Sequence, residues 1–374
     1  MADQRPWSGQ RSPSFSEQQL MKLVAYPWII VGASLVSLPI SAAQEIQPRM
    51  KFKAHSGSTR TVLITADDKF LITRGESYLG NDGKLVGDND VKVWNLATGK
   101  QRDFPKLAGQ TIALSPDDKT LAVADDRWVR LVDLLTGNEV AAFKDNEFPV
   151  VSVAFSPDGK ILAIGSSKDG PNPGSMVGVA QLRDLATGKP IATLEPNKGP
   201  MRALAFSPDG KLLAVATQTF PSIGDVRLWS VSTGKVHSTL EAGGVDCLAF
   251  SPDGKTLAAG CGGRLDRTKR DAPHHVRLWN VEAATSLHFC RHEFRVMCVG
   301  YSPDGRTVAA GSELGELALW DTATGELDRY VPDQPPYVLC VIFTRDGKTL
   351  VSTNRNGEVC YWDVAQLPQR IANK

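Results

Sequence analysis

The sequence has almost no net charge, because 42 lysines and arginines are balanced by 41 aspartates and glutamates. A chain without an excess of positive charge produces no broad field that would draw it onto nucleic acid or an anionic membrane. Short catalytic signatures are also missing: the chain has no nucleophile elbow, phosphate-binding loop, zinc-protease helix or dinucleotide fingerprint. These gaps argue against a nucleic-acid-binding protein and against the enzymes that short motifs identify.

Long apolar runs are absent except for one, residues 23–40, which are 18 residues without a charge. Met21 and Lys22 precede this run, and the small residues 41–43 follow it. This order predicts a secretory signal cleaved after Ala43, with Met21 as the true start. Two alternatives stay open, a buried helix and a membrane anchor formed by residues 23–40, with Arg5, Arg11 and Lys22 held inside. Under the signal and anchor readings the protein is extracytoplasmic, either periplasmic or secreted, and touches a membrane only through residues 1–43.

Two short patterns alternate strictly from about residue 50 onward, with seven copies of each. The first is VAFSPDGKILAIGS at 153–166, and its turn aspartates are Asp67, Asp117, Asp158, Asp209, Asp253, Asp304 and Asp346. The second is VKVWNLATGK at 91–100. Apolar residues cluster or alternate over four to six positions and are then interrupted by a turn signal, which is typical of short β-strands.

The SPDG segments predict tight turns, since proline presets φ and glycine accepts a positive φ. Asp68 and Asp118 stand where the other copies have that glycine, and we expect positive φ there too. Each repeat then supplies about four strands. Such a unit cannot bury both of its faces alone, so neighbouring repeats must cover them, as in a β-propeller.

The second pattern resembles the WD-40 repeat family, and the resemblance covers residues 50–364. The family's tryptophan position holds Trp94, Trp229, Trp279, Trp320 and Trp362, whereas Val132 and Arg183 depart from it. The FSPDGK and LATGK copies resemble bacterial members in style. The resemblance implies an all-β fold in residues 44–374, a seven-bladed β-propeller of four-stranded antiparallel blades. It also implies that residues 50–55, MKFKAH, close the ring as the outer strand of the last blade.

Almost all length variation between repeats lies in one connection, between the second and third strands of a blade. From the turn aspartate to the tryptophan position it spans 15 residues in blade two, Asp117 to Val132, but 27 in blade one, Asp67 to Trp94. All these connections emerge on one side of a propeller, which we call the decorated face. Its insertions are residues 75–90, 166–178, 218–225 and 262–275. We expect the second of these, rich in glycine, proline and serine, to be only a flexible loop.

Loops on a rigid scaffold usually carry binding sites. The blade-five insertion concentrates four cations in seven residues, Arg264, Arg267, Lys269 and Arg270, that can grip an anionic partner. The alternative is a solvated charged loop. We expect Tyr78 and Phe220 in neighbouring insertions to act as aromatic anchors for a protein or peptide partner. No aromatic residues interleave with the four cations, which argues against nucleic acid.

Several histidines invite a metal interpretation but match structural positions better. His55 and His292 lie where the family places a histidine that bonds an aspartate of the decorated face and supports the blade. Asp88 is the matching partner for His55, whereas Leu314 occupies that place in blade six and predicts a broken pair. Asp88 also resembles a metal-binding pair with Asp90, but a solvated loop is the preferred interpretation. The adjacent pair His274 and His275 lacks companions at metal-ligand spacing, so we predict no metal and no cofactor.

Cysteine is scarce, with six residues. Cys247, Cys298 and Cys340 each lie six residues before a turn aspartate, where other repeats have small residues, and this predicts packing in the innermost strands. Cys261, Cys290 and Cys360 remain, and the sequence cannot choose a disulfide among them. We expect mostly free thiols.

The preferred interpretation is therefore a monomeric, non-catalytic interaction scaffold that docks a protein or peptide on the decorated face. The alternative is an enzyme, a hydrolase or lyase, or a binder of glycans or small ligands, with its site in the central funnel. An enzyme needs a compact polar cluster with perturbed carboxylates or histidines at the funnel mouth, whereas a scaffold offers a broad surface.

Overall fold

The computed structural model describes residues 46–369 apart from 80–82, 171, 173–174, 219–223, 263–273 and 332–334. This part of the chain is built from β-strands and one short 3₁₀ helix, η2 (Val364–Gln366). None of its helices has the length and apolar character needed to cross a membrane. The proposed signal or anchor segment, residues 1–43, lies outside the described residues.

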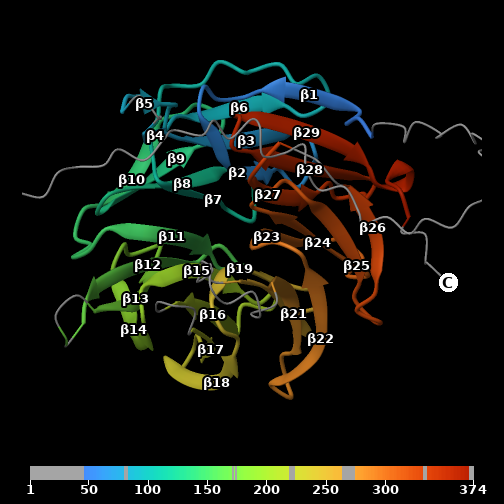
Figure 1. The fold of residues 1–374 in the computed structure, drawn as a ribbon. Helices are drawn as coiled ribbons and strands as arrows, with labels where there is room; N and C mark the ends of the chain where they lie inside the picture. Colours follow the sequence, from blue (N-terminus) through green and yellow to red (C-terminus); the bar gives the residue numbers. More distant parts are fainter. Residues whose placement is uncertain are drawn as a thin grey trace, which may run out of the picture. The chain divides into compact units, whose positions relative to one another are not determined.

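Seven antiparallel sheets are arranged radially around a central axis (Figure 1). Blades one to four, listed from the axis outward, are β2 (Ser58–Ile64), β3 (Phe70–Glu76) and β6 (Val91–Asn95); β7 (Thr111–Leu114), β8 (Thr120–Asp125), β9 (Trp128–Asp133) and β10 (Glu139–Phe143); β11 (Val150–Phe155), β12 (Ile161–Asp169), β13 (Met176–Asp184) and β14 (Pro190–Lys198); β15 (Met201–Phe206), β16 (Leu212–Thr217), β17 (Asp225–Ser230) and β18 (Lys235–Glu241).

Blades five to seven are β19 (Val245–Phe250), β20 (Thr256–Cys261), β21 (His274–Asn280) and β22 (Thr285–His292); β23 (Val296–Tyr301), β24 (Thr307–Ser312), β25 (Leu317–Asp321) and β26 (Leu327–Val331); β27 (Val338–Phe343), β28 (Thr349–Asn354), β29 (Glu358–Asp363) and β1 (Met50–Lys53). A small hairpin of β4 (Tyr78–Leu79) and β5 (Leu85–Val86) stands apart from the seven sheets. The fold is the all-β, seven-bladed propeller predicted from the sequence.

Hydrogen bonds within the repeated turns explain why the first pattern recurs. In the blade-three turn the Ser156 hydroxyl donates to an Asp158 carboxylate oxygen at 2.6 Å and accepts from the Ile161 amide at 2.9 Å. The following glycine, Gly159, has a φ of 70°. Asp68 and Asp118 occupy the glycine place with φ of 53° and 59°, which confirms the prediction of positive φ.

The hydrophobic core lies between the blades. Seven buried clusters can be distinguished, and each joins residues of two neighbouring blades. The cluster of blades four and five, for example, packs Val226 and Leu240 against Val245 and Trp279. The innermost strands contact one another around the whole ring, including β2 with both β7 and β27. Each blade therefore depends on its neighbours to bury its faces.

The ring closes through β1, which pairs antiparallel with β29 in the last blade. The register places Phe52 opposite Val359, and the Phe52 ring lies 4.8 Å from Trp94 and 6.2 Å from Tyr361 between centroids. The first strand of the propeller thus covers the outer edge of blade seven, as predicted.

Two details of the blades differ from the prediction. In blade one the outer edge has two isolated bridges in place of a fourth strand, Trp94 to Gln101 and Asp90 to Ala108, and Pro105 between them cannot donate to a ladder. In blade three the insertion at 166–178 was predicted to be a flexible loop, and this was wrong. It extends β12 and β13, which stay paired as far as Asp169 and Met176.

Candidate functional site

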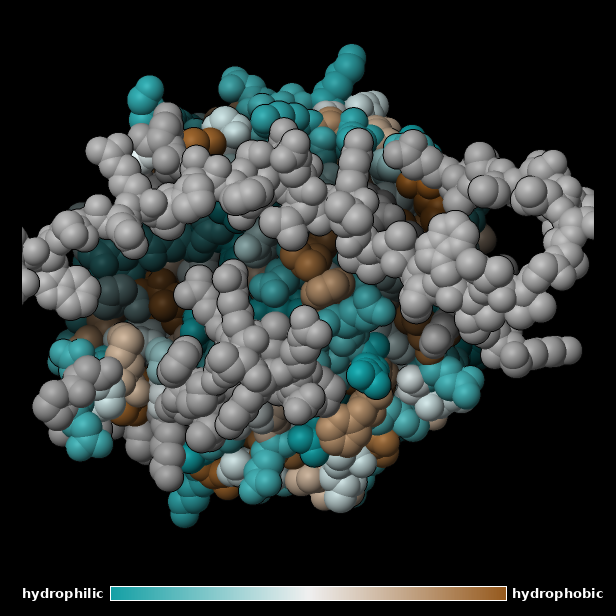
Figure 2. All heavy atoms as spheres, viewed as in Figure 1, coloured by the Kyte–Doolittle hydropathy of each residue, from teal (hydrophilic) through white to brown (hydrophobic). Residues whose placement is uncertain are grey.

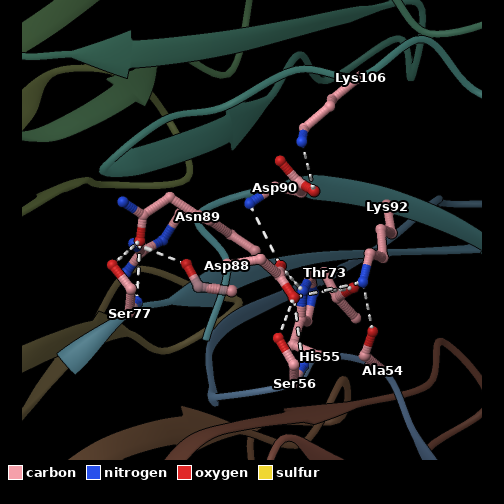
Figure 3. Close-up of polar contacts among 12 residues, drawn as sticks. Ala54, His55, Ser56, Thr73, Ser77, Asp88, Asn89, Asp90, Lys92 and Lys106 are labelled. Atoms are coloured by element: carbon pink, nitrogen blue, oxygen red, sulfur yellow. Dashed lines mark hydrogen bonds and ion pairs between the residues drawn. The ribbon is translucent and has the colours of Figure 1, made fainter. Parts of the chain in front are cut away.

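The first insertion of the decorated face is anchored by a buried chain of hydrogen bonds (Figure 3). The Trp94 indole donates to Thr73 Oγ1 at 2.8 Å, and His55 Nε2 lies 2.8 Å from the same hydroxyl. His55 Nδ1 lies 2.5 Å from an oxygen of Asp88. The four residues come from β6, β3, the segment after β1, and the insertion, so the chain ties the insertion to the body of blade one.

The electrostatics of this network fit a neutral imidazole beside an ionised carboxylate. Burial lowers the pKa of His55, and the hydrogen bond to Asp88 offsets this only in part. Burial alone would raise the pKa of Asp88, but hydrogen bonds from His55 and Ser56 outweigh it and hold that pKa at about 2. Neutral His55 then donates from Nδ1 to Asp88 and accepts from the Thr73 hydroxyl at Nε2.

The same end of the insertion is also held by Ser77 near its start and by the segment that leads into blade two. The Asn89 side chain accepts from the Ser77 amide at 2.9 Å, and its backbone oxygen accepts from the Gly109 amide at 3.1 Å. Asp90 forms a bridge with Ala108. The insertion is therefore fixed between two blades, which is the condition for presenting a side chain in a defined position.

That side chain is Tyr78, at the start of the β4–β5 hairpin. The Arg355 guanidinium lies over the Tyr78 ring at 4.8 Å and over the Tyr337 ring at 4.9 Å from the centroids. Arg355 is exposed and both tyrosines are half-buried. We call these three residues the Tyr–Arg–Tyr stack; it brings together loops of blades one and seven and the connection between blades six and seven. A cation held between two rings is preorganised for contact with a partner.

Tyr337 carries backbone strain. Its φ is 63°, a region that bulky side chains rarely adopt. Its amide donates to the Glu313 carbonyl of blade six at 2.8 Å, which helps to hold this conformation. Strain at a half-buried surface residue is often retained for function.

One exposed aromatic residue on this face escaped the sequence analysis. Trp128 starts β9 after the shortest kind of connection and is 53% exposed. The Lys144 ammonium lies 4.9 Å from its ring centroid. Trp128 lies in a short turn, so the length variation between repeats gives no signal for it.

A ring of side chains at the funnel mouth was also missed. The innermost strands of six blades contain a β-bulge at the same register, and the bulged residues are Arg60, Val151, Arg202, Asp246, Met297 and Leu339. We call this set the bulge ring. Both faces of these strands pack on neighbouring blades, so exposed members such as Arg60 and Arg202 face the axis. Bulges re-aim side chains and are frequent next to functional sites.

One member of the bulge ring is neutralised. Asp246 accepts two hydrogen bonds from Arg295, at 2.6 and 2.8 Å, and the hydrogen bond to Asp246 raises the pKa of Arg295. The pair leaves Arg60 and Arg202 as the charged members without a described ion-pair partner.

Blade six corrects another expectation. The sequence predicted a broken pair because Leu314 occupies the aspartate position, and Leu314 is indeed exposed. Glu316 instead supplies the carboxylate: one oxygen lies 2.9 Å from His292 Nδ1, and the other accepts from the Tyr330 hydroxyl at 2.6 Å. Burial alone would raise the pKa of Glu316, but these hydrogen bonds lower it. The longer glutamate side chain reaches the histidine from a position two residues further along.

The remaining predicted residues fall into three groups. Arg264, Arg267, Lys269, Arg270 and Phe220 lie outside the described residues. The tryptophans are buried in the third strands of their blades, and these are Trp94, Trp229, Trp279, Trp320 and Trp362. All six cysteines are free, and burial raises the pKa of each thiol. In the described ranges no group of three metal-ligating side chains is placed to hold an ion.

The described surface in Figure 2 is mainly hydrophilic, with hydrophobic residues in small separate patches. A groove of about 690 Å³ lies elsewhere, between the turns of blades four and five, with Asp209, His237 and Glu282 among its lining residues. Its lysines Lys211 and Lys255 are paired with neighbouring aspartates at 3.3 and 3.8 Å. The lysine charges of the groove are therefore compensated within it, whereas the decorated face carries the stacked cation Arg355.

Comparison with known proteins agrees with this architecture. The family model described as WD domain, G-beta repeat matches residues 137–170, 188–220, 231–268, 284–321 and 330–363. The matches begin after β9, so the structure adds the first two blades.

Three relatives illustrate the similarity. Apoptotic protease-activating factor 1 of Rattus norvegicus is 26% identical over 66% of this chain and 18% of its own length. Serine-threonine kinase receptor-associated protein of Gallus gallus is 26% identical over 49% of this chain and 58% of its own. WD repeat-containing protein SL1-17 of Schistosoma mansoni is 31% identical over 35% of this chain and 41% of its own. The matched stretch covers less than two thirds of each relative. Together with the seven sheets, these matches show that the chain is a seven-bladed β-propeller that contains WD40 repeats.

Proposed function

We propose that this protein is a non-catalytic scaffold that docks a protein or peptide partner on its decorated face. The observation that carries the proposal is the Tyr–Arg–Tyr stack. Tyrosine, tryptophan and arginine dominate the binding energy of protein interfaces, and here they are held on a rigid framework. Exposed Trp128 adds a second aromatic contact on the same face. The name of one relative describes association with a receptor kinase, which agrees with a protein-binding role.

The four cations at 264–270 extend the proposed docking surface, in line with the sequence prediction. We further propose that the propeller works as a monomer outside the cytoplasm, after cleavage or anchoring of residues 1–43. The support for the location is the order of charge, apolar run and small residues in that segment.

The test is a crosslinking pull-down from the native envelope fraction with the tagged full-length protein as bait. Two variants remove the docking features: Tyr78→Ala with Arg355→Ala, and Ser at all four cation positions. Lys211→Ser on the opposite face is the matched control. A protein captured by the wild type and the control but lost from either docking variant supports the proposal. Equal capture by all four baits contradicts it.

Localisation needs a separate measurement. Mass spectrometry of the mature N-terminus in the fractionated cell distinguishes the alternatives. A start at Gln44 supports a cleaved signal, and an intact segment in the membrane fraction supports an anchor. Recovery of the intact chain from the cytoplasm contradicts both.

A further inference from the structure

Arg74 is the exception among seven equivalent positions. In each blade the residue of the second strand that pairs at this register is small, except in blade one. The cross-strand partners at this register are Thr61–Arg74, Thr111–Ala124, Ser152–Gly165, Ala203–Ala216, Cys247–Gly260, Cys298–Gly311 and Cys340–Thr353. A charged residue at a position that otherwise demands small size calls for a physical explanation.

The other blade interfaces show why small residues are needed. A Cβ on Gly311 would lie 2.2 Å from a methyl carbon of Val338 in the next blade, and one on Gly260 would lie 2.7 Å from Val296. The residue that corresponds to Val296 and Val338 in blade two is Gly109, two positions before Thr111. A large side chain at 74 is thus matched by the loss of one at 109.

The space left by Gly109 explains why a large residue fits at position 74, but it does not explain why that residue is charged. Arg74 is only 5% exposed. Its Nη1 donates to the Gly75 carbonyl at 3.2 Å, and its Nε has no partner. Among the described residues no carboxylate lies within ion-pair distance of it, although Glu76 attracts it from further away. Burying an unpaired charge is costly, and a methionine of similar length would avoid the cost.

A second cation lies next to it. The β-bulge in β2 places Arg60 and Thr61 opposite the single residue Arg74. Burial, with a smaller contribution in the same direction from the neighbouring charge of Arg60, lowers the pKa of Arg74 to about 10. The Arg74 guanidinium is therefore still charged at neutral pH, and the neighbouring Arg60 cation repels it. Two adjacent arginines with no acid in ion-pair contact among the described residues favour an anion between them.

We propose that Arg60 and Arg74 form a binding site for an oxyanion, a carboxylate or phosphate group, at the funnel mouth of blade one. The exposed Arg60 side chain faces the axis and receives the anion from solvent. Arg74 supplies the desolvated charge, which acts more strongly because less water screens it. The acid of the bulge ring, Asp246, does not compete, since Arg295 already neutralises it.

Fluorescence anisotropy with a fluorescein-labelled hexaglutamate peptide and the full-length protein tests the site. We expect the peptide to bind the wild type, and hexaglutamine not to bind. Arg74→Met, which keeps the volume, and Arg60→Gln should each weaken binding about tenfold, the scale of a charged hydrogen bond. Arg306→Met is the matched control, because it removes one exposed cation from a turn on the opposite face. It should bind like the wild type.

Inorganic phosphate separates the two sources of the anion. Displacement of the peptide by phosphate shows that the site recognises a free oxyanion, and lack of displacement shows that it needs a carboxylate-bearing segment. Wild-type affinity in both Arg74→Met and Arg60→Gln overturns the proposal, as does equal weakening in Arg306→Met. Thermal unfolding shows whether each variant is folded, and Arg60→Gln carries the test if Arg74→Met is not.

Thermal unfolding is also a second readout. Without an anion, Arg74→Met should unfold at a higher temperature than the wild type, because a buried unpaired charge is gone, whereas a purely structural arginine predicts the reverse. The site uses residues other than the Tyr–Arg–Tyr stack and the assay contains no partner protein. Its failure therefore leaves the scaffold proposal standing.

Discussion

Asp246 and Arg295 are 49 residues apart in sequence and join blades five and six through two parallel hydrogen bonds, at 2.6 and 2.8 Å. Asp246 is the bulged residue of β19, and Arg295 directly precedes β23. Their side chains are only 10% and 16% exposed, so water screens the pair weakly. The pair fixes the funnel mouth at the interface between these two blades.

Removing one partner of this pair should cost more than removing both. Asp246→Asn leaves a largely buried guanidinium without its charge partner, and we expect a loss of about 3 kcal/mol in the free energy of unfolding. The double variant Asp246→Asn with Arg295→Met should lose less than the sum of Asp246→Asn and Arg295→Met made singly. Urea unfolding of the four proteins of this cycle measures the coupling. Strict additivity would show that the two side chains contribute independently.

The His55–Asp88 network predicts a two-step acid response. The pKa of His55 lies below its ordinary 6.5, so its stabilising effect is complete above about pH 6.5 and falls as the pH drops below it, where only the unfolded chain takes up the proton. The pKa of Asp88 falls from 3.8 to about 2, so its contribution is present above about pH 4 and is lost toward pH 2.

His55→Gln isolates the first step. This variant should be about 1–3 kcal/mol less stable at pH 7, because Asp88 and Thr73 lose a buried partner. Its stability should also change less than that of the wild type between pH 7 and pH 5. Chemical unfolding at both pH values measures this difference, and parallel curves for the two proteins would contradict the titration of His55.

Ring closure should depend on the apolar side of β1. Phe52 is half-buried against Trp94 and Tyr361, so Phe52→Ala should reduce stability by about 1–2 kcal/mol. The neighbouring Lys51→Ala is the control, since it removes only an exposed ion pair with Glu358 at 3.3 Å, and such pairs contribute less than about 1 kcal/mol. Thermal unfolding compares the two, and equal effects would argue against closure by packing of Phe52.

Replacing Tyr337 distinguishes an effect on stability from an effect on partner docking. Glycine tolerates a φ of 63° without strain, so Tyr337→Gly should remove about 1 kcal/mol of backbone strain. This gain in stability should roughly offset the loss of the ring contact. The melting temperature should then stay nearly unchanged, while partner capture weakens about tenfold because the stack loses one ring. Arg355→Lys is the companion variant, since it keeps the charge without the planar group. Unchanged capture in both variants would remove the stack from the docking surface.

The repeat made most of the architecture predictable from sequence. Residue types at fixed spacing predicted three features: the positive φ of Asp68 and Asp118, the outer strand before residue 54, and the position of Cys247 in an innermost strand. The glycine- and proline-rich composition of 166–178 predicted a flexible loop. The residues at both ends of this segment nevertheless continue the paired strands β12 and β13. Glu316 was missed because a longer side chain can act from a different position in the turn.

The site was less predictable than the fold. The bulge ring depends on strand register, which leaves no composition signal in the bulged residues themselves. The Tyr–Arg–Tyr stack joins residues 78, 337 and 355, whose proximity exists only once the ring is closed. Only Tyr78 stood out in the sequence, because it lies in an insertion.

The pairing of β1 with β29 also sets an order for biosynthesis. Met50 is synthesised early, whereas Tyr361, its pairing partner in β29, is added more than 300 residues later. Until then the nascent chain exposes an unpaired strand at one end and an incomplete stack of blades at the other. Such non-local pairing slows folding and leaves edges open to wrong partners. A chaperone that shields the β1 segment during synthesis would therefore raise the yield of folded protein more than one acting on any middle blade.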